Sequence, residues 1–469
     1  MSSSPTPPYR HASRQSTGSR RRDSEQSFIA LEEARTSYSA RGELPIHDGT
    51  PPLPPPQAPS RRRHMVMIKP SGESGRSGFH PLQFAKITWV SSCRASLLCN
   101  IFWPVVPAAL VIRYVRPDLH VLIFILTYMS MIPCANLVGF AGQELSRKVN
   151  HVFGVLVETT FGSVVEVILF IVLLQDNQFT VIKAAILGSI LATMLLCLGM
   201  CFVAGGMERD EAEFSETVGE AGTGLLFTAG VALAVPAVFS YSMAASLTVE
   251  QLEHKIIRIS RVVSVLLVIA YCVFVYFQAR THHGIYDAIF ENDEQREDKS
   301  CGHVSKPRLT MTECIVALVL AVTLVTFMAI YLVEQIHPIV MRHSFVSDHF
   351  MGLILVPLVE KAAEHLTAVN EAWDNRMNFA LSHVLGSTLQ TALLNGPLTV
   401  IVAWALDKPM DIVFEVFDVT MLILAILTVG NFLRDQKSNY LEGFLCIVAY
   451  LAIGVAAFYY PNPEGTGGH

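Results

Sequence analysis

The sequence predicts an all-α polytopic membrane protein of about 11 transmembrane helices, built as one peripheral helix plus two inverted five-helix repeats. Composition predicts the membrane class: 51% of the 469 residues are hydrophobic, 16% are charged, and the mean hydropathy is +0.42. A soluble domain usually carries roughly 25% charged residues. About eleven segments also hold some 20 mainly apolar residues each, enough to cross ~30 Å of hydrocarbon. An internal repeat predicts how these helices are arranged.

The predicted spans divide the chain into five regions. Residues 1–80 are expected to form a disordered cytosolic tail, because their proline-rich and arginine-rich strings cannot bury a core. The peripheral helix and the first repeat then occupy 81–280, a cytosolic loop 281–311, the second repeat 312–460 and a short tail 461–469. The spans are expected at 95–115, 119–141, 151–175, 180–206, 221–244, 258–280, 312–336, 348–371, 377–405, 413–433 and 439–460.

Basic residues predict the orientation of the chain. Fourteen lysines and arginines lie between Arg10 and Arg94, and such an excess marks the cytosolic side of a membrane. If the spans alternate from there, Arg147, Arg376 and the 281–311 loop also face the cytosol. The sequence therefore predicts an integral membrane protein with a cytosolic N-terminus.

The internal repeat joins two stretches of about 40 residues. The stretch from Gly154 to Thr193 recurs from Gly352 to Thr391, so that each paired residue returns 198 positions later. The copies begin at the third and eighth predicted spans. Because an odd number of spans separates them, they cross the membrane in opposite directions, and inverted repeats are typical of alternating-access transporters.

Both copies place a glutamate inside an apolar span, Glu166 in the first and Glu364 in the second. A charge at the bilayer centre costs roughly 3 kcal/mol or more, so such acids mark functional sites. Burial disfavours the carboxylate charge, and the group then binds either a cation or a proton. Glu166 and Glu364 are therefore predicted as metal ligands and proton carriers. A purely structural polar clamp between helices is the alternative.

Neighbouring residues complete the predicted site between the third, fourth, eighth and ninth spans. Calcium prefers six to eight oxygen ligands, so neutral oxygens are needed beside the carboxylates. Ser189, Ser387 and Gln390 are predicted to supply them. Small residues let helices approach closely, and this packing role is assigned to Gly162, Gly188 and Gly386.

At these residues the chain resembles the CAX-type calcium/proton exchangers of the cation/calcium exchanger superfamily. The similarity covers about 85–460 and rests on LGSILATMLLCLGMCFVAGG, VPLVEKAAEHLTAV, ALSHVLGSTLQTALL and QKSNYLEGF. It implies secondary antiport rather than enzyme catalysis, moving Ca²⁺ from the cytosol into a vacuole or similar organelle against protons. It implies the lipid bilayer, the cation and protons as partners, no nucleic acid, and no cofactor beyond the transported ions. The oligomeric state stays open.

The chain departs from that family at the site. The family's first repeat reads Gly-Asn-Ala-Thr/Ala-Glu, and here Ser163 replaces the asparagine before Glu166. The second reads Gly-Asn-Ala-Ala-Glu-His, and here Glu360 and Lys361 precede Glu364 and His365. Ser163, Glu360, Lys361 and His365 are therefore predicted to modulate the site, His365 because imidazole titrates near neutral pH.

Lys361 leaves three arrangements open. Glu360 neutralises it, or it loses its proton when a cation binds, or it occupies the cation's place. At an effective dielectric constant of about 20, repulsion between the ammonium and a divalent ion reaches several kcal/mol. Two alternatives to Ca²⁺/H⁺ exchange follow: exchange of a monovalent cation for protons, or a transport-deficient membrane scaffold or regulator. An intramembrane enzyme is disfavoured, because no His-Glu-x-x-His string lies in the spans.

Overall fold

The computed structural model describes residues 78–90, 94–149, 151–207, 211–278, 308–342 and 347–461. The chain divides into two units, 1–64 and 65–469, and all described residues belong to the second. The predictions for most of the N-terminal tail, the 281–311 loop and the C-terminal tail lie outside the described residues.

The helices of the first half follow the predicted spans. They are α2 (Pro81–Val90), α3 (Arg94–Asn100), α4 (Val105–Val115), α5 (His120–Ser146), α6 (His151–Gln175), α7 (Phe179–Leu191), the π-helical η2 (Ala192–Cys197), α8 (Leu198–Gly206), α9 (Glu216–Met243) and α10 (Val249–Tyr276). The single helix expected at 95–115 is interrupted between α3 and α4. Pro104 lies at this break, immediately before α4, where proline's fixed backbone angle suits a helix start.

The second half begins with the long helix α12 (Met311–Arg342). It continues with α13 (Asp348–Phe350), η4 (Met351–Leu355), α14 (Val356–Glu360), α15 (Ala362–Trp373), α16 (Met377–Gln390), η5 (Thr391–Asn395), α17 (Gly396–Ala405), α18 (Val416–Phe432) and α19 (Tyr440–Phe458). The helix expected at 348–371 is likewise divided, because Lys361 separates α14 from α15.

Seven helices in the described part of the chain are long and apolar enough to cross a membrane. The total of about 11 spans stays a prediction, because α6 and α18 contribute shorter apolar stretches. Along α10, the apolar side chains of Val262, Leu266, Ile269 and Val273 are exposed on one face. By contrast, every residue from 184 to 195 is buried, so α7 and η2 lie at the centre of the protein.

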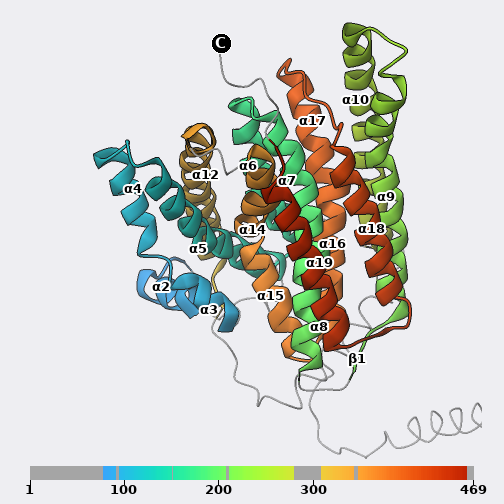
Figure 1. Ribbon diagram of the computed structural model, residues 1–469. Coiled ribbons are helices and arrows are strands. Elements are labelled where there is room, and N and C mark those ends of the chain that lie inside the picture. The colour runs from blue at the N-terminus through green and yellow to red at the C-terminus, as the bar shows by residue number, and fades with distance from the viewer. Residues whose placement is uncertain are drawn as a thin grey trace, which may run out of the picture. The chain divides into compact units, whose positions relative to one another are not determined.

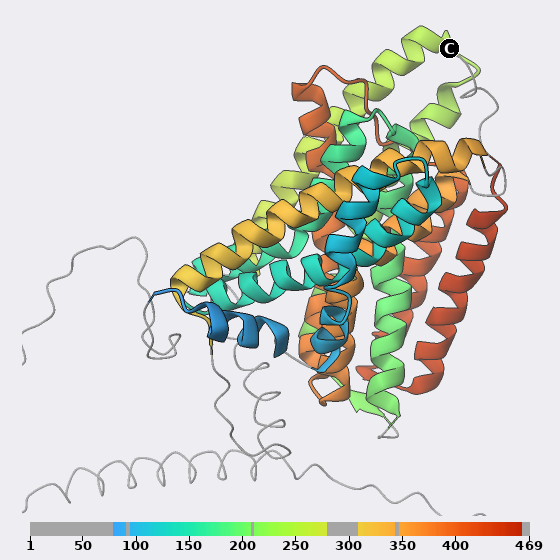
Figure 2. The same ribbon diagram turned by 90° about the vertical axis from the view of Figure 1, so that its left-hand side faces the viewer.

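The two repeats run in opposite directions. In Figure 1, the chain descends from α7 to α8 and ascends from α16 to α17. Each of these two helical stretches, α7 to α8 and α16 to α17, contains a π-helical segment at the equivalent place. This segment is η2 in the first stretch and η5 in the second. The first helices of the repeats, α5 and α12, pack side by side (Figure 2). The predicted inverted architecture is therefore confirmed.

A close helix crossing joins the repeats. At Gly188 on α7, an added Cβ would overlap the backbone carbonyl of Leu353 in η4. At Gly352, an added Cβ would lie 2.5 Å from the carbonyl oxygen of Val181. Only glycine permits this approach at Gly188 and Gly352. The prediction of close packing at Gly386 is wrong, because an added Cβ there would meet no atom within 4 Å.

A short antiparallel pairing links the segments before α9 and α19. Strand β1 (Ala212–Glu213) pairs with β2 (Lys437–Ser438). The Lys437 ammonium donates to the Glu211 carboxylate at 2.6 Å, and this hydrogen bond raises the pKa of Lys437. The pairing ties the two repeats together at the end of the protein where α8 ends.

Candidate cation site

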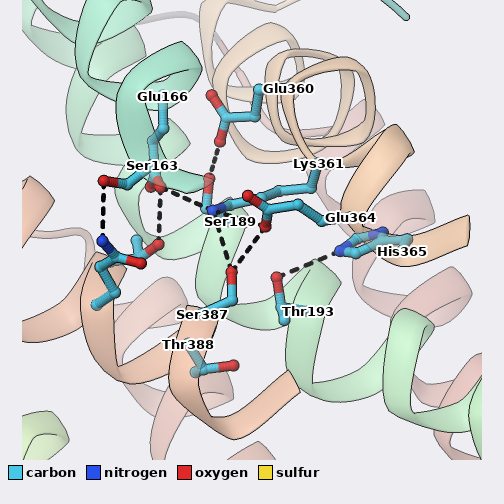
Figure 3. A network of polar contacts seen from close by, with 12 residues as sticks. Ser163, Glu166, Ser189, Thr193, Glu360, Lys361, Glu364, His365, Ser387 and Thr388 are labelled. Carbon is cyan, nitrogen blue, oxygen red and sulfur yellow. Dashed lines mark hydrogen bonds and ion pairs between the residues drawn. The ribbon is translucent and has the colours of Figure 1, made fainter. Parts of the chain in front are cut away.

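The centre of the protein holds a buried lysine between two glutamates (Figure 3). Lys361 Nζ lies 2.9 Å from Glu166 Oε2 on α6 and 3.3 Å from Glu364 Oε2 on α15. It also donates to Ser387 Oγ on α16 at 3.2 Å. The side chain of Lys361 is only 2% exposed. The two acids of the inverted repeats therefore meet at one positive group.

Glu166 is the more deeply buried carboxylate of the pair. Its side chain is 1% exposed. Besides Lys361, Glu166 Oε2 accepts hydrogen bonds from Thr391 Oγ1 at 2.9 Å and Asn395 Nδ2 at 2.7 Å. Both donors belong to η5, whose π-helical turn widens the backbone spiral, a feature frequent at functional sites. In the described part of the chain, Glu166 Oε1 and Asn395 Oδ1 have no hydrogen-bond partner.

Glu364 is the accessible carboxylate. Its side chain is 20% exposed, and its Oε2 accepts a hydrogen bond from Ser387 Oγ at 2.9 Å. It lines a cavity of about 410 Å³. This cavity extends between α5, α6, α10, α15 and α16 and includes Gly162, Glu360, Glu371, His383, Gly386, Ser387 and Gln390 in its lining. A solute in the cavity therefore meets Glu364 before it meets Glu166.

A second layer of polar contacts surrounds this centre. Ser189 Oγ donates to Glu360 Oε1, and Glu360 is 3% exposed with no partner for its Oε2 among the described residues. Gln390 Nε2 donates to Ser163 Oγ at 2.9 Å. These bonds connect α7 to α14 and α16 to α6. The layer therefore ties α6 to α16, which carry Glu166 and Ser387, and ties α14, which ends beside Lys361, to α7.

The charges of the centre favour one cation at a time. The carboxylates of Glu166 and Glu364 contact a single ammonium group, and a third carboxylate, that of Glu360, lies in the layer around them. At an effective dielectric constant of about 20, two unit charges 4 Å apart interact by about 4 kcal/mol, and a divalent ion doubles this value. The arrangement attracts a cation strongly, and it repels a second cation placed beside the first.

Comparison with known proteins matches this architecture to a family. The model of the sodium/calcium exchanger protein family matches residues 119–280 and 314–459. The vacuolar calcium ion transporter of Schizosaccharomyces pombe is 30% identical over 72% of this chain and 80% of its own length. The chain belongs to the sodium/calcium exchanger protein family. The vacuolar cation/proton exchanger 2 of Arabidopsis thaliana is 28% identical over 83% of this chain and 88% of its own.

A solved structure agrees with that assignment. The Ca²⁺/H⁺ antiporter protein YfkE is 25% identical, with a TM-score of 0.63, over 77% of this chain and all of its own. The predicted resemblance to CAX-type exchangers is confirmed. The protein is a secondary transporter and not an enzyme, since the family consists of cation exchangers.

Most of the predicted site residues of this exchanger come together. Glu166, Glu364, Ser387 and Lys361 form the central network, and Ser163, Ser189, Glu360 and Gln390 form the layer around it. Gly162 lies beside them, since an added Cβ would be 3.8 Å from Glu364 Oε1. That these groups bind a transported cation stays a prediction.

One of the arrangements open for Lys361, neutralisation by Glu360, involves no ion pair between the two in the described part of the exchanger. The ion pairs of Lys361 there are with Glu166 and Glu364. Adjacent residues in a helix point in different directions, and the Glu360 side chain turns to Ser189 on α7 instead. Glu360 therefore does not neutralise Lys361 by direct contact.

His365 points away from its neighbour Glu364. Its Nε2 lies 3.3 Å from Thr193 Oγ1 of η2, and the residue is 4% exposed. Consecutive helical positions differ by about 100°, so His365 faces η2 while Glu364 faces the cavity. The His365 ring therefore contacts Thr193 of η2 and does not line the cavity that Glu364 borders.

Two hydrogen-bond donors to Glu166, Thr391 and Asn395, are not among the predicted site residues. Thr391 was recognised only as the repeat partner of Thr193, and Asn395 was not singled out. A signal was present, because the two residues lie four positions apart and so share one face of an apolar helical segment. Their polar side chains in a membrane span were the indication to follow.

Proposed function

We propose that this exchanger moves Ca²⁺ out of the cytosol into the lumen of a vacuole or related organelle in return for protons. The observation that carries the proposal is the meeting of Glu166 and Glu364, from antiparallel repeats, at one positive group. Two carboxylates balance the charge of a calcium ion, and hydroxyl and amide oxygens add hard neutral ligands. The similarity to a vacuolar calcium ion transporter and to a vacuolar cation/proton exchanger supports the same substrate and membrane.

The geometry supports different roles for the two acids in cation binding. Glu364 borders the cavity and receives the cation first, with Ser387 oriented toward it. Glu166 then binds from the closed side through its Oε1, which has no hydrogen-bond partner among the described residues. A proton on a buried carboxylate removes the charge that attracts the cation. Competition between proton and cation for the same oxygens therefore couples the two fluxes.

Lys361 favours a second candidate function. An ammonium already placed between the two acids is also what a transport-deficient membrane regulator would require. A monovalent exchanger is the related alternative, because a singly charged ion meets half the repulsion of a divalent one. A flux measurement separates the three functions.

The test is uptake of radioactive calcium by proteoliposomes under an imposed proton gradient. Gradient-driven uptake is expected, and Glu364→Gln is expected to lower the uptake rate at limiting calcium by about tenfold or more, since ~1.4 kcal/mol of lost binding suffices. Glu334→Gln is the matched control, because it removes an ion pair with Arg113 at an exposed edge. Sodium- or potassium-dependent proton flux without calcium uptake indicates the monovalent exchanger. No flux of any cation from a folded wild-type protein indicates the regulator.

A further inference from the structure

We propose that Lys361 is a tethered occupant of the cation site, which the transported cation displaces in every cycle. This inference rests on the proposed function, because it assumes that a cation reaches the two glutamates. It adds a component to the site: a positive group of the protein itself that competes with the substrate.

The contacts of Lys361 are those expected of a bound cation. Its Nζ lies within 3.3 Å of oxygen atoms from three helices, namely Glu166 Oε2 on α6, Glu364 Oε2 on α15 and Ser387 Oγ on α16. The two carboxylates and the hydroxyl are also hard oxygen ligands of the kind that Ca²⁺ binds. The ammonium therefore fills the position between the acids that the substrate needs.

The backbone of Lys361 is held in place while its side chain has somewhere to go. Its amide donates to Pro357 O at 3.0 Å, and its carbonyl accepts from the His365 amide at 2.8 Å. The nearby open space is the cavity that Glu364 and Ser387 line. A displaced ammonium therefore swings about a fixed backbone rather than leaving with its helix.

The structure also provides an acceptor for the displaced ammonium. Glu360 lines the same cavity, is 3% exposed, and its Oε2 has no hydrogen-bond partner among the described residues. A buried carboxylate oxygen without a donor is costly. Adjacent helical side chains point in different directions, so the long Lys361 side chain must rotate into the cavity to reach the Glu360 carboxylate, which lines that cavity. Glu360 would then hold the ammonium while the substrate occupies the centre.

Displacement has a direct consequence for affinity. The ammonium and a divalent cation repel each other at short range, so the substrate binds only when the ammonium withdraws. The observed affinity is then the intrinsic affinity reduced by the fraction of protein in which the centre is free. Removing the charge of Lys361 should therefore strengthen calcium binding, whereas keeping the charge should not.

The experiment measures Ca²⁺ binding to the purified full-length protein by calorimetry and by Ca²⁺-dependent thermal stabilisation. Lys361→Met removes the charge at similar length, Lys361→Asn removes it with a shorter side chain, and Lys361→Arg retains it. The two neutral variants are expected to bind Ca²⁺ about tenfold or more tightly than the wild type. The arginine variant is expected to bind no more tightly than the wild type.

Three results overturn the inference. The first is neutral variants that elute as folded protein and bind Ca²⁺ no more tightly than the wild type. The second is an arginine variant that binds as tightly as they do. The third comes from Glu360→Gln, which keeps Lys361 and can be measured even if neither neutral variant folds. This variant is expected to bind Ca²⁺ about tenfold more weakly than the wild type. Unchanged binding by this variant contradicts the displacement. A wild type that binds Ca²⁺ yet shows no gradient-driven uptake instead overturns the proposed function alone.

Discussion

Replacing Glu166 with glutamine is expected to destabilise the protein by ~3–5 kcal/mol, the usual cost of removing one partner from a buried ion pair. Glu166 is 1% exposed and accepts hydrogen bonds from Lys361, Thr391 and Asn395. The amide is neutral, so the change removes the negative charge that pairs with the Lys361 ammonium, even where the amide oxygen still accepts from Thr391 and Asn395. Lys361 then keeps only Glu364 as an ion-pair partner. Cation exchange should be lost together with stability.

Thermal unfolding of the purified variants in detergent measures this effect. Glu364→Gln serves as the comparison and should be less destabilising, because that side chain is 20% exposed and borders the cavity. Adding Lys361→Met to Glu166→Gln should recover part of the loss, since the second change removes the unpaired ammonium. The proposed pairing would be contradicted if the double variant lost as much stability as the two single variants together.

Replacing Gly188 with alanine is expected to prevent normal folding, although the change adds a single methyl group. The new Cβ would overlap the Leu353 carbonyl of η4, and backbone at the centre of the protein cannot move aside as a flexible side chain can. The helices α7 and η4 would have to separate. This separation would also displace Ser189 from Glu360 in the layer around the cation site.

The repeat supplies a matched control for this change. Gly386 occupies the equivalent position 198 residues later, and an added Cβ there would meet no atom within 4 Å. Gly386→Ala should therefore be produced in normal amounts, whereas Gly188→Ala should be lost or aggregated. Size-exclusion chromatography of both variants, fused to a fluorescent reporter, measures the difference. Equal behaviour of the two variants would contradict the crossing.

The sequence alone determined the membrane class, the inverted repeat and the pair of acids. Each of these depends on a property of the residue order alone. Apolar length decides whether a helix can span the bilayer, and the number of spans between the copies decides their relative direction. An acid in an apolar span is costly enough to require a function. Glu166 and Glu364 could therefore be identified without coordinates.

The tertiary structure alone decided what those residues contact. The repeat equates Gly188 with Gly386, yet Gly188 packs closely against η4, whereas Gly386 borders a cavity. The sequence leaves three arrangements open for Lys361. In the structure, its place at the break between α14 and α15 directs it to both site glutamates. Side-chain contacts depend on the surfaces that other helices present, and those surfaces differ between the repeats. Sequence symmetry therefore specifies where the backbone goes, while packing specifies which groups meet.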